Sequence, residues 1–375
     1  MTADGHRALD VGDLTLVARG AAILGTGGGG DPYVGRLMAE QALRDHGPVS
    51  LVALEDVPDD ATVFPVAMMG APTVMVEKLP TSDQFVGAVR MLSTYLGRPV
   101  THLACAEAGG INSMIPIIAA AQLGLPLVDA DLMGRAFPEL QMVLPTLAGI
   151  PGTPMSIADE KGNCGILQTV DNRWSERLSR VMTIEMGCSA IISNVVMDGA
   201  TMRANAVGGT LGLCHRLGAA IEAARSAKRP PVEAVVRTLC GRVVLGAAKV
   251  VDVERRTSTG FARGEATLVP LAAGPDTDER LVLHFQNEHL LATRHLDGDS
   301  RVEVTTPDLI IVLDADTGEP ITTEGLRFGQ RVSVVAAPCD ERWHSPAGIE
   351  LVGPRYFGYD TNPVRAVPDR ELTNA

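Results

Sequence analysis

The sequence has few aromatic residues, no excess of basic residues and no long uncharged apolar run. Only 3% of its 375 residues are Phe, Trp or Tyr, which argues against a stacking platform for single-stranded nucleic acid. Acidic residues outnumber basic ones by 45 to 32, so the formal net charge is −13, and a chain of that sign is repelled by nucleic acids and anionic membranes. No stretch of 18 apolar residues lacks charges or turn formers, so no membrane span is expected.

The residues of the common metal and redox motifs are scattered along the chain. The 6 cysteines contain no CxxC pair and the 8 histidines no HxH or HExxH spacing, which excludes a zinc ribbon and a thioredoxin motif. The start, MTADGHRALD, lacks the basic and apolar regions of a secretory signal. Scattered cysteines in an acidic chain without such a signal are typical of a reducing compartment, so we expect a cytoplasmic location.

What the sequence does contain is enough apolar material, 46%, for a full core and for two domains. Strand and helix signals alternate over residues 1–240, which predicts a layered α/β domain with a mostly parallel sheet. Six short β-rich runs between turn signals predict a β-rich sandwich or barrel-like domain over 241–350. Residues 351–365 hold a Gly-Pro pair and three aromatics, and we expect this return segment to pack back on the first domain.

The segment GTGGGGDP is the strongest local signal. Its glycines permit positive φ angles and expose backbone N–H groups, and a helix is expected to follow with Asp31 as its N-cap. Such a loop predicts an anion or ligand site, with a purely structural turn as the alternative. A dinucleotide fingerprint fits poorly because the preceding residues look helical, so no nucleotide cofactor is expected. The glycines concerned are Gly27, Gly28, Gly29 and Gly30.

A second candidate segment, ACAEAGGINSMIP, follows a predicted strand and opens a helix. Glu107 and Asn112 are therefore expected at the carboxyl edge of a sheet, where open α/β folds bind ligands. Glu107 is a candidate acid, base or metal ligand. The alternative is that Glu107 stabilises the start of the next helix.

A third segment, PLVDADLMGRAFPELQM, places Asp129 and Asp131 two residues apart after a buried strand. Two carboxylates so close repel each other unless a cation lies between them, and either a divalent metal or Arg135 would serve. Oxygen ligands favour magnesium, calcium or manganese, whereas zinc would recruit histidine or cysteine. A divalent metal ion is thus the one candidate cofactor, and a solvated loop with an Arg135 ion pair is the alternative.

Two further residues, Cys188 and Asn287, are candidates for a place in the site. Cys188, in EMGCSA, lies in a glycine-containing segment at a predicted sheet edge and is a candidate nucleophile, provided that a base or a helix N-terminus lies nearby. Asn287, in FQNEHL, follows a predicted strand. It is expected either to reach a ligand or to hold a contact between domains.

Taken together, these segments resemble one known family. ARGAAILGTGGGGDPY, EAGGINSMIP, LVDADLMGRAFPELQM, GFARGE, FQNE, TPDLIIVLD and GPRYFGYD occur in this order between Asp10 and Asp360, and the set is similar to that of the bacterial S-methyl thiohydantoin desulfurase-like family. Genes of that family often accompany hydantoinase- or oxoprolinase-type proteins. The resemblance implies an α/β domain followed by a β-rich one. It also implies a reaction in which water adds to an S-methylated thiohydantoin ring, methanethiol leaves and a hydantoin remains.

This reaction suggests roles for the candidate residues. We expect Asp129, Asp131 or Glu107 to activate water, alone or through a metal held by the two aspartates. Cys188 offers a rival route through a thiolate. Backbone N–H groups of the glycine loop would stabilise negative charge on the ring or bind a substrate carboxylate. The candidate substrate-binding residues are Gly27–Gly30, Asp31, Asn112, Arg135 and Asn287.

Other functions stay open at this point. The protein could be a non-catalytic ligand-binding or accessory subunit beside a hydantoinase- or oxoprolinase-type enzyme. It could also be a metal-dependent amidohydrolase acting on a related ring, although the lack of clustered histidines counts against that. The expected partners are a small heterocyclic substrate, a hydantoinase-type protein and a second copy of the chain, for which the apolar helices near 112–124 and 210–227 would serve.

Overall fold

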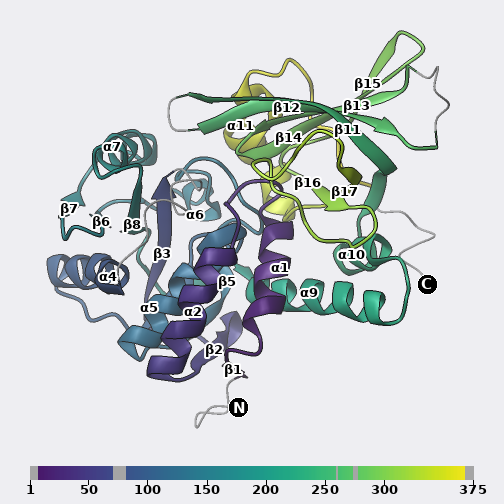
Figure 1. The fold of residues 1–375 in the computed structure, drawn as a ribbon. Coiled ribbons are helices and arrows are strands. Elements are labelled where there is room, and N and C mark those ends of the chain that lie inside the picture. The colour runs from purple at the N-terminus through teal and green to yellow at the C-terminus, as the bar shows by residue number, and fades with distance from the viewer. Residues whose placement is uncertain (1–6, 71–81, 259–260, 273–277, 368–375) are drawn as a thin grey trace. The chain divides into compact units, whose positions relative to one another are not determined.

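The computed structural model describes residues 7–70, 82–258, 261–272 and 278–367 (Figure 1). The chain divides into two compact units. Unit 1 comprises Met1–Ala21, Asp31–Gly134 and Glu139–His215, and unit 2 comprises Ala22–Gly30, Arg135–Pro138 and Arg216–Ala375. The glycine loop and the short segment that begins at Arg135 therefore belong to unit 2, although both are surrounded in sequence by unit 1. Among the described residues, no helix has the length and apolar character needed to cross a bilayer.

Unit 1 is built on one sheet with a parallel centre. Its strand order is β1-β2-β5-β4-β3-β8-β6-β7, and the short strands β9 and β10 pair with β3 and β5. The four strands from β2 to β3 in this order are parallel, and antiparallel strands extend the sheet on both sides. The strands are β1 (Arg7–Leu9), β2 (Val49–Ala53), β3 (Thr62–Gly70), β4 (His102–Cys105), β5 (Leu127–Asp131), β6 (Met155–Ala158), β7 (Cys164–Leu167), β8 (Ser189–Ser193), β9 (Met197–Asp198) and β10 (Val207–Gly208).

Helices cover this sheet. α5 is apolar all round and almost wholly buried, as expected of a helix that packs on parallel strands on one side and under another helix on the other. It contacts the central strands, and α2 packs over it (Figure 1). The helices and 3-10 turns are α2 (Tyr33–His46), η1 (Leu54–Asp56), α4 (Ser82–Leu96), η2 (Gly110–Ser113), α5 (Ile115–Leu123), α6 (Leu144–Leu147), α7 (Asn172–Glu185) and α8 (Gly199–Asn205). Two further helices, α1 (Leu14–Leu24) and α9 (Thr210–Ser226), have residues in both units.

Unit 2 contains one antiparallel sheet of seven strands, in the order β15-β14-β13-β12-β11-β17-β16. Register shifts along β11, where it pairs with β12 and β17, mark bulges, and bulges bend a sheet so that it can curl over its own core. The strands are β11 (Arg242–Ser258), β12 (Phe261–Pro270), β13 (Arg280–Gln286), β14 (Glu288–Leu296), β15 (Asp299–Thr305), β16 (Leu309–Asp314) and β17 (Arg331–Ala337). The helical segments are α10 (Pro231–Leu239), η3 (Glu341–His344), α11 (Pro346–Val352) and η4 (Pro354–Phe357).

The fold confirms the predicted class, an α/β unit with a parallel sheet core and a β-rich, barrel-like unit. The predicted division at residue 240 falls between α10 and β11. In the return segment, Val364 O accepts a hydrogen bond from Thr305 N at 3.0 Å. Val352 O accepts another from Thr306 Oγ1 at 2.8 Å. These bonds tie the return segment to the residues that precede β16.

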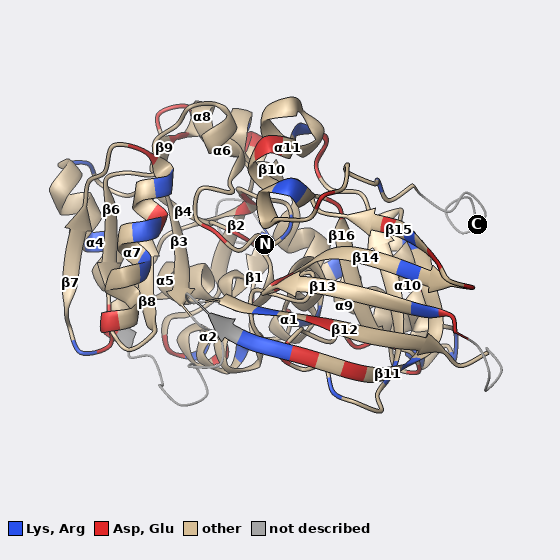
Figure 2. Cartoon of the chain, turned by 90° about the horizontal axis from the view of Figure 1, so that it is seen from above, with Lys and Arg blue, Asp and Glu red and all other residues tan. Residues whose placement is uncertain are grey.

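Charges of both signs are mixed along the sheet of unit 2. Figure 2 shows acidic and basic residues following one another along β11. The sequence of this strand includes Lys249, Asp252, Glu254 and Arg255. A strand of this kind presents no basic stripe of the sort that tracks a nucleic-acid backbone.

Candidate functional site

The carboxyl ends of β4 and β5 bring together three acidic residues that the sequence singled out. The two strands are parallel neighbours, with Leu103 opposite Leu127, so Glu107, just after β4, and Asp129 and Asp131, at the end of β5, lie at the same sheet edge. Burial raises the pKa of the Cys105 thiol well above its usual value, and the charges of Asp131, Asp129 and Glu107 raise it further. This is the edge at which open α/β sheets bind ligands.

Glu107 is held by Asn112, and both side chains are buried. The Asn112 amide nitrogen Nδ2 donates to Glu107 Oε1 at 2.6 Å. The same amide group binds the backbone of Met68, accepting from its N–H at 2.7 Å and donating to its carbonyl at 3.2 Å. Because two bonds to β3 fix the amide plane, the amide fixes the orientation of the Glu107 carboxylate. The structure thus brings together the two residues of the predicted second segment.

Asp131 builds the loop that carries Glu107. Its side chain is completely buried. One carboxylate oxygen accepts from Ala108 N at 2.8 Å, and the other accepts from Gly134 N at 2.8 Å. Hydrogen bonds from backbone N–H groups stabilise the negative charge of a buried carboxylate, and this stabilisation requires no metal. Asp131 therefore positions both the loop after β4, through Ala108, and the turn after β5, through Gly134.

Asp129 stabilises the start of α9. Its Oδ1 accepts from Leu211 N at 2.8 Å and from Gly212 N at 3.1 Å. The first N–H groups of a helix have no partner within the helix, and a negative charge there is favoured by the helix dipole. A metal bound by Asp129 and Asp131 stays a prediction.

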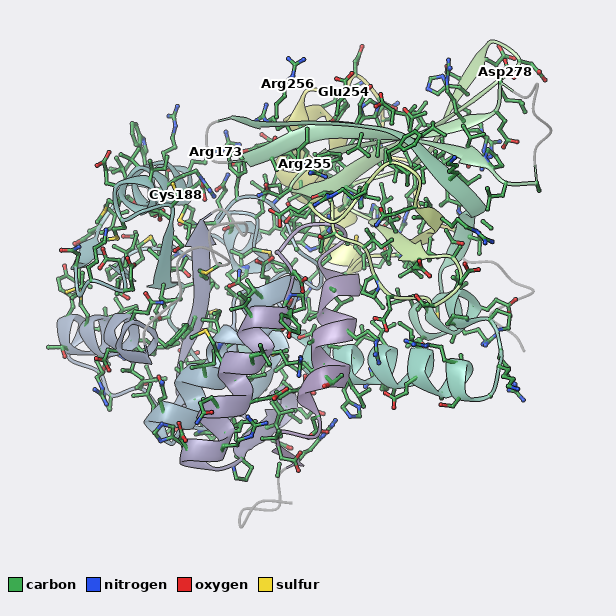
Figure 3. The ribbon with its side chains drawn as sticks, viewed as in Figure 1. Arg173, Cys188, Glu254, Arg255, Arg256 and Asp278 are labelled. Atoms are coloured by element: carbon green, nitrogen blue, oxygen red, sulfur yellow. The ribbon has the colours of Figure 1, made fainter. Side chains whose placement is uncertain are left out.

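Cys188 lies just before β8, where the chain leaves α7 (Figure 3). It has a positive φ of 65°, and its N–H donates to Thr183 O at 2.9 Å. The residue is thus at the C-terminal end of a helix, whereas a thiolate nucleophile is favoured at the N-terminal end. Nothing in these contacts provides the activation that a nucleophilic role for Cys188 requires.

The glycine loop lies directly against the hairpin of β13 and β14 in unit 2. His289 N donates to Thr26 O at 2.8 Å, and Thr323 N donates to Gly27 O at 2.7 Å. A Cβ added at Gly28 would lie 2.0 Å from Glu288 Oε1, so a larger residue here would require the Glu288 side chain to move. Positive φ angles at Gly27, Gly29 and Gly30 turn the chain here. Asp31 follows the loop in unit 1, where its Oδ1 accepts from Tyr33 N at 2.9 Å; α2 starts one residue later than expected, at Tyr33.

Arg135 is completely buried in unit 2 and joins two of its segments. The guanidinium donates to Thr26 Oγ1 at 2.6 Å and to Asp308 O at 2.8 Å. It also stacks on the ring of Phe137 at 4.6 Å from the centroid. These contacts make Arg135 a support of the glycine loop, and its predicted contact with substrate stays a prediction.

Asn287 forms the tip of the same hairpin, as the single residue between β13 and β14. It has a positive φ of 56°, and its Oδ1 accepts from Ala262 N at 2.9 Å. Two residues on, His289 is completely buried, with Nδ1 3.1 Å from Ile310 O. Burial lowers the pKa of His289 to about 4, and the positive charge of Arg135 adds to this effect. No pattern in the sequence marks this neutral histidine apart from its place next to Asn287 and Glu288.

Family models match both halves of the sequence. The S-Me-THD-like N-terminal domain matches residues 12–169, and the S-Me-THD-like C-terminal domain matches residues 170–366. The chain belongs to the S-Me-THD-like family. The family predicted from the sequence segments is therefore confirmed.

A solved structure shows the same fold. The crystal structure of a protein from Chromobacterium violaceum has a TM-score of 0.77 to this S-Me-THD-like chain at 24% identity, covering 96% of this chain and 99% of that one. No curated protein matches the sequence. The comparisons thus establish the family and the fold.

Proposed function

We propose that this S-Me-THD-like protein is a hydrolase that acts on an S-methylated thiohydantoin or a related cyclic amide or thioamide. The observation that carries the proposal is the Glu107 carboxylate, buried at the carboxyl edge of the parallel strands and oriented by Asn112 at 2.6 Å. A carboxylate fixed at the ligand edge of an α/β sheet is placed to act as a general base. The family membership supports the choice of ring.

The reaction consumes one water. Glu107 takes a proton from water as the oxygen attacks the ring carbon that carries the S-methyl group, and the adjacent ring nitrogen gains this proton. The adduct then collapses to a carbonyl, the carbon–sulfur bond breaks, and the second proton of water leaves on sulfur as methanethiol. A general base of this kind increases the rate about 10²–10⁴-fold.

Two neighbours of Glu107 are positioning residues. Asn112 fixes the carboxylate through its bonds to Met68. Asp131 fixes the loop through Ala108, the residue that follows Glu107. Small displacements of a catalytic group lower the rate steeply, so a change at either residue should lower kcat more than it raises KM.

The test is turnover by the purified full chain. S-methyl thiohydantoin, a hydantoin and an oxoproline-type lactam are supplied separately. Methanethiol is measured with a thiol reagent and the ring products by mass spectrometry. Glu107→Gln, which keeps the shape of the side chain, should lower kcat/KM at least about 100-fold. Glu55→Gln, at an exposed glutamate of η1, is the control and should retain full activity.

The outcomes separate the proposals. A folded Glu107→Gln variant with unchanged kcat/KM would show that another group activates water. Folded wild-type protein that turns over none of the three rings would overturn the hydrolase proposal. It would favour the accessory-subunit alternative, in which the protein binds a ring for a hydantoinase-type enzyme.

A further inference from the structure

Three chemically different metal ligands meet in unit 2. The ligand atoms of Asp308, Cys339 and His344 all lie within 4.8 Å of one another. Asp308 comes just before β16 and Cys339 just after β17, and these antiparallel strands pair with Leu309 opposite Ala337. Since the start of β16 lies beside the end of β17, the fold places the aspartate next to the cysteine. His344, at the end of η3, completes the group.

The distances within this cluster suit one shared ion. His344 Nε2 lies 2.9 Å from Asp308 Oδ1 and 3.5 Å from Cys339 Sγ. One ring nitrogen carries either a proton or a lone pair, so it cannot serve both neighbours fully as hydrogen-bond partners. Ligand pairs around a tetrahedral zinc ion, with bonds of about 2.0–2.3 Å, are separated by about 3.3–3.6 Å. Small side-chain shifts would therefore bring all three atoms onto one ion.

The surroundings hold these ligands in place. Asp308 is completely buried, and its Oδ2 accepts from Ala366 N at 2.6 Å while Oδ1 accepts from Cys339 N at 3.1 Å. Arg135 donates to the backbone carbonyl of the same aspartate at 2.8 Å. Hydrogen bonds of this outer shell orient metal ligands in proteins. Cys339 and His344 are only partly buried, so the cluster is not sealed from solvent.

We propose that Asp308, Cys339 and His344 bind a divalent transition metal ion of the zinc type, with solvent in the fourth position. Thiolate and imidazole donors select such ions over magnesium and calcium. The site differs in place and chemistry from the oxygen site predicted at Asp129 and Asp131. It is also independent of the hydrolase proposal, which uses no ion. A bound ion would join the start of β16, the end of β17 and η3.

The experiment uses the full chain, stripped with a chelator, dialysed and titrated with Zn²⁺ or Co²⁺. We expect one equivalent of zinc per chain by elemental analysis and, with cobalt, the sulfur-to-metal band and the intense visible bands of a tetrahedral complex. Cys339→Ser and His344→Gln should weaken zinc binding more than about 100-fold, beyond the roughly 10–100-fold that loss of an outer-shell partner costs. The matched controls are Cys240→Ser, an exposed cysteine, and His295→Gln, a histidine bonded to Ser300; both should bind zinc as wild type does.

A ligand that binds only the folded chain raises its melting temperature with concentration. Zinc should therefore raise the Tm of wild type and of both controls but not of the two cluster variants. Their Tm without metal shows whether they are folded, and Cys339→Ser changes a single atom. The proposal is overturned if stripped wild type takes up no zinc, or if both cluster variants bind zinc as tightly as wild type does. It is also overturned if the cobalt complex of wild type lacks the sulfur-to-metal band. None of these results bears on the Glu107→Gln comparison.

Discussion

The two units use their aspartates in different ways. In unit 1, Asp129 and Asp131 are close in sequence, and each accepts hydrogen bonds from backbone N–H groups. In unit 2, Asp308 faces the side chain of His344, which is 36 residues away in sequence. Nearness in sequence therefore does not identify the acid that is placed to hold a ligand. The neighbouring side chains do: Asp308 also accepts hydrogen bonds from backbone N–H groups, those of Ala366 and Cys339, but a histidine and a cysteine beside it provide further ligands.

Glu107 stands between these two cases. Its partner is a side-chain amide, and that amide is itself fixed to β3. The carboxylate is thus oriented by a residue of the same connection between β4 and α5, whose amide is anchored on a neighbouring strand. This arrangement is expected where a carboxylate is held for a reaction rather than for the fold.

The largest effect on stability is expected for Asp131→Ala. The change leaves the N–H groups of Ala108 and Gly134 buried without their acceptors. At about 1.5–3 kcal/mol for each bond to a charged group, the free energy of unfolding should fall by at least about 3 kcal/mol. Urea denaturation measures it.

The matched control for Asp131→Ala is Asp59→Ala. Asp59 forms an ion pair with Arg203 but its side chain is 82% exposed, so its loss should cost less than about 1 kcal/mol. If Asp131→Ala were as stable as Asp59→Ala, the loop-building role of Asp131 would be wrong, and the predicted metal site would become the better explanation of this residue.

A somewhat smaller effect is expected from pH, through His289. Unfolded histidine has a pKa of about 6.5, and burial in unit 2 lowers it to about 4. Between pH 6.5 and pH 4, the imidazole of His289 binds a proton in the unfolded chain but not in the folded chain. The free energy of unfolding therefore falls as the pH falls. The whole loss is about 3 kcal/mol, complete near pH 4 and absent above pH 6.5.

His289→Gln tests this assignment. It removes the titrating group, so the free energy of unfolding of the variant should depend less on pH between 6.5 and 4 than that of wild type. If the free energy of unfolding depended equally on pH in wild type and His289→Gln, other groups would cause the loss of stability. The contrast between His289, a buried histidine without a ligand role, and His344, the proposed metal ligand, would then no longer hold.

Most of the fold followed from local patterns, and the exceptions have local causes. The apolar runs before Glu107 and Asp129 correspond to β4 and β5. β14 carries Leu290, Leu291 and Ala292 in a row, so its sequence does not show the alternation of polar and apolar residues that predicts a strand. β6 and β7 have only four residues each, too few to show a period.

The candidate sites also differ in how far the local sequence predicts them. Glu107 and Asn112 were predictable because both follow one strand and open one helix. Asp308, Cys339 and His344 were not, because only the pairing of β16 with β17 brings them together, and the interval of 31 residues between the first two matches no metal motif. Likewise, the membership of Gly27 in unit 2 depends on contacts with Thr323, far along the chain.

The smallest effect is expected at Cys188, where the sequence offered a rival mechanism. Cys188→Ser keeps the size and the positive φ of the residue, and serine is a far weaker nucleophile. If Glu107 activates water, kcat/KM of this variant should stay within about twofold of wild type, because the removed atom takes no part in the transition state. A loss of at least about 100-fold at unchanged Tm would contradict this expectation and move the chemistry to a thiolate. Measured beside Glu107→Gln in the same methanethiol assay, the variant decides which of two neighbouring parts of unit 1 reacts with the ring: the oriented carboxylate that follows β4, or the thiol at the end of α7.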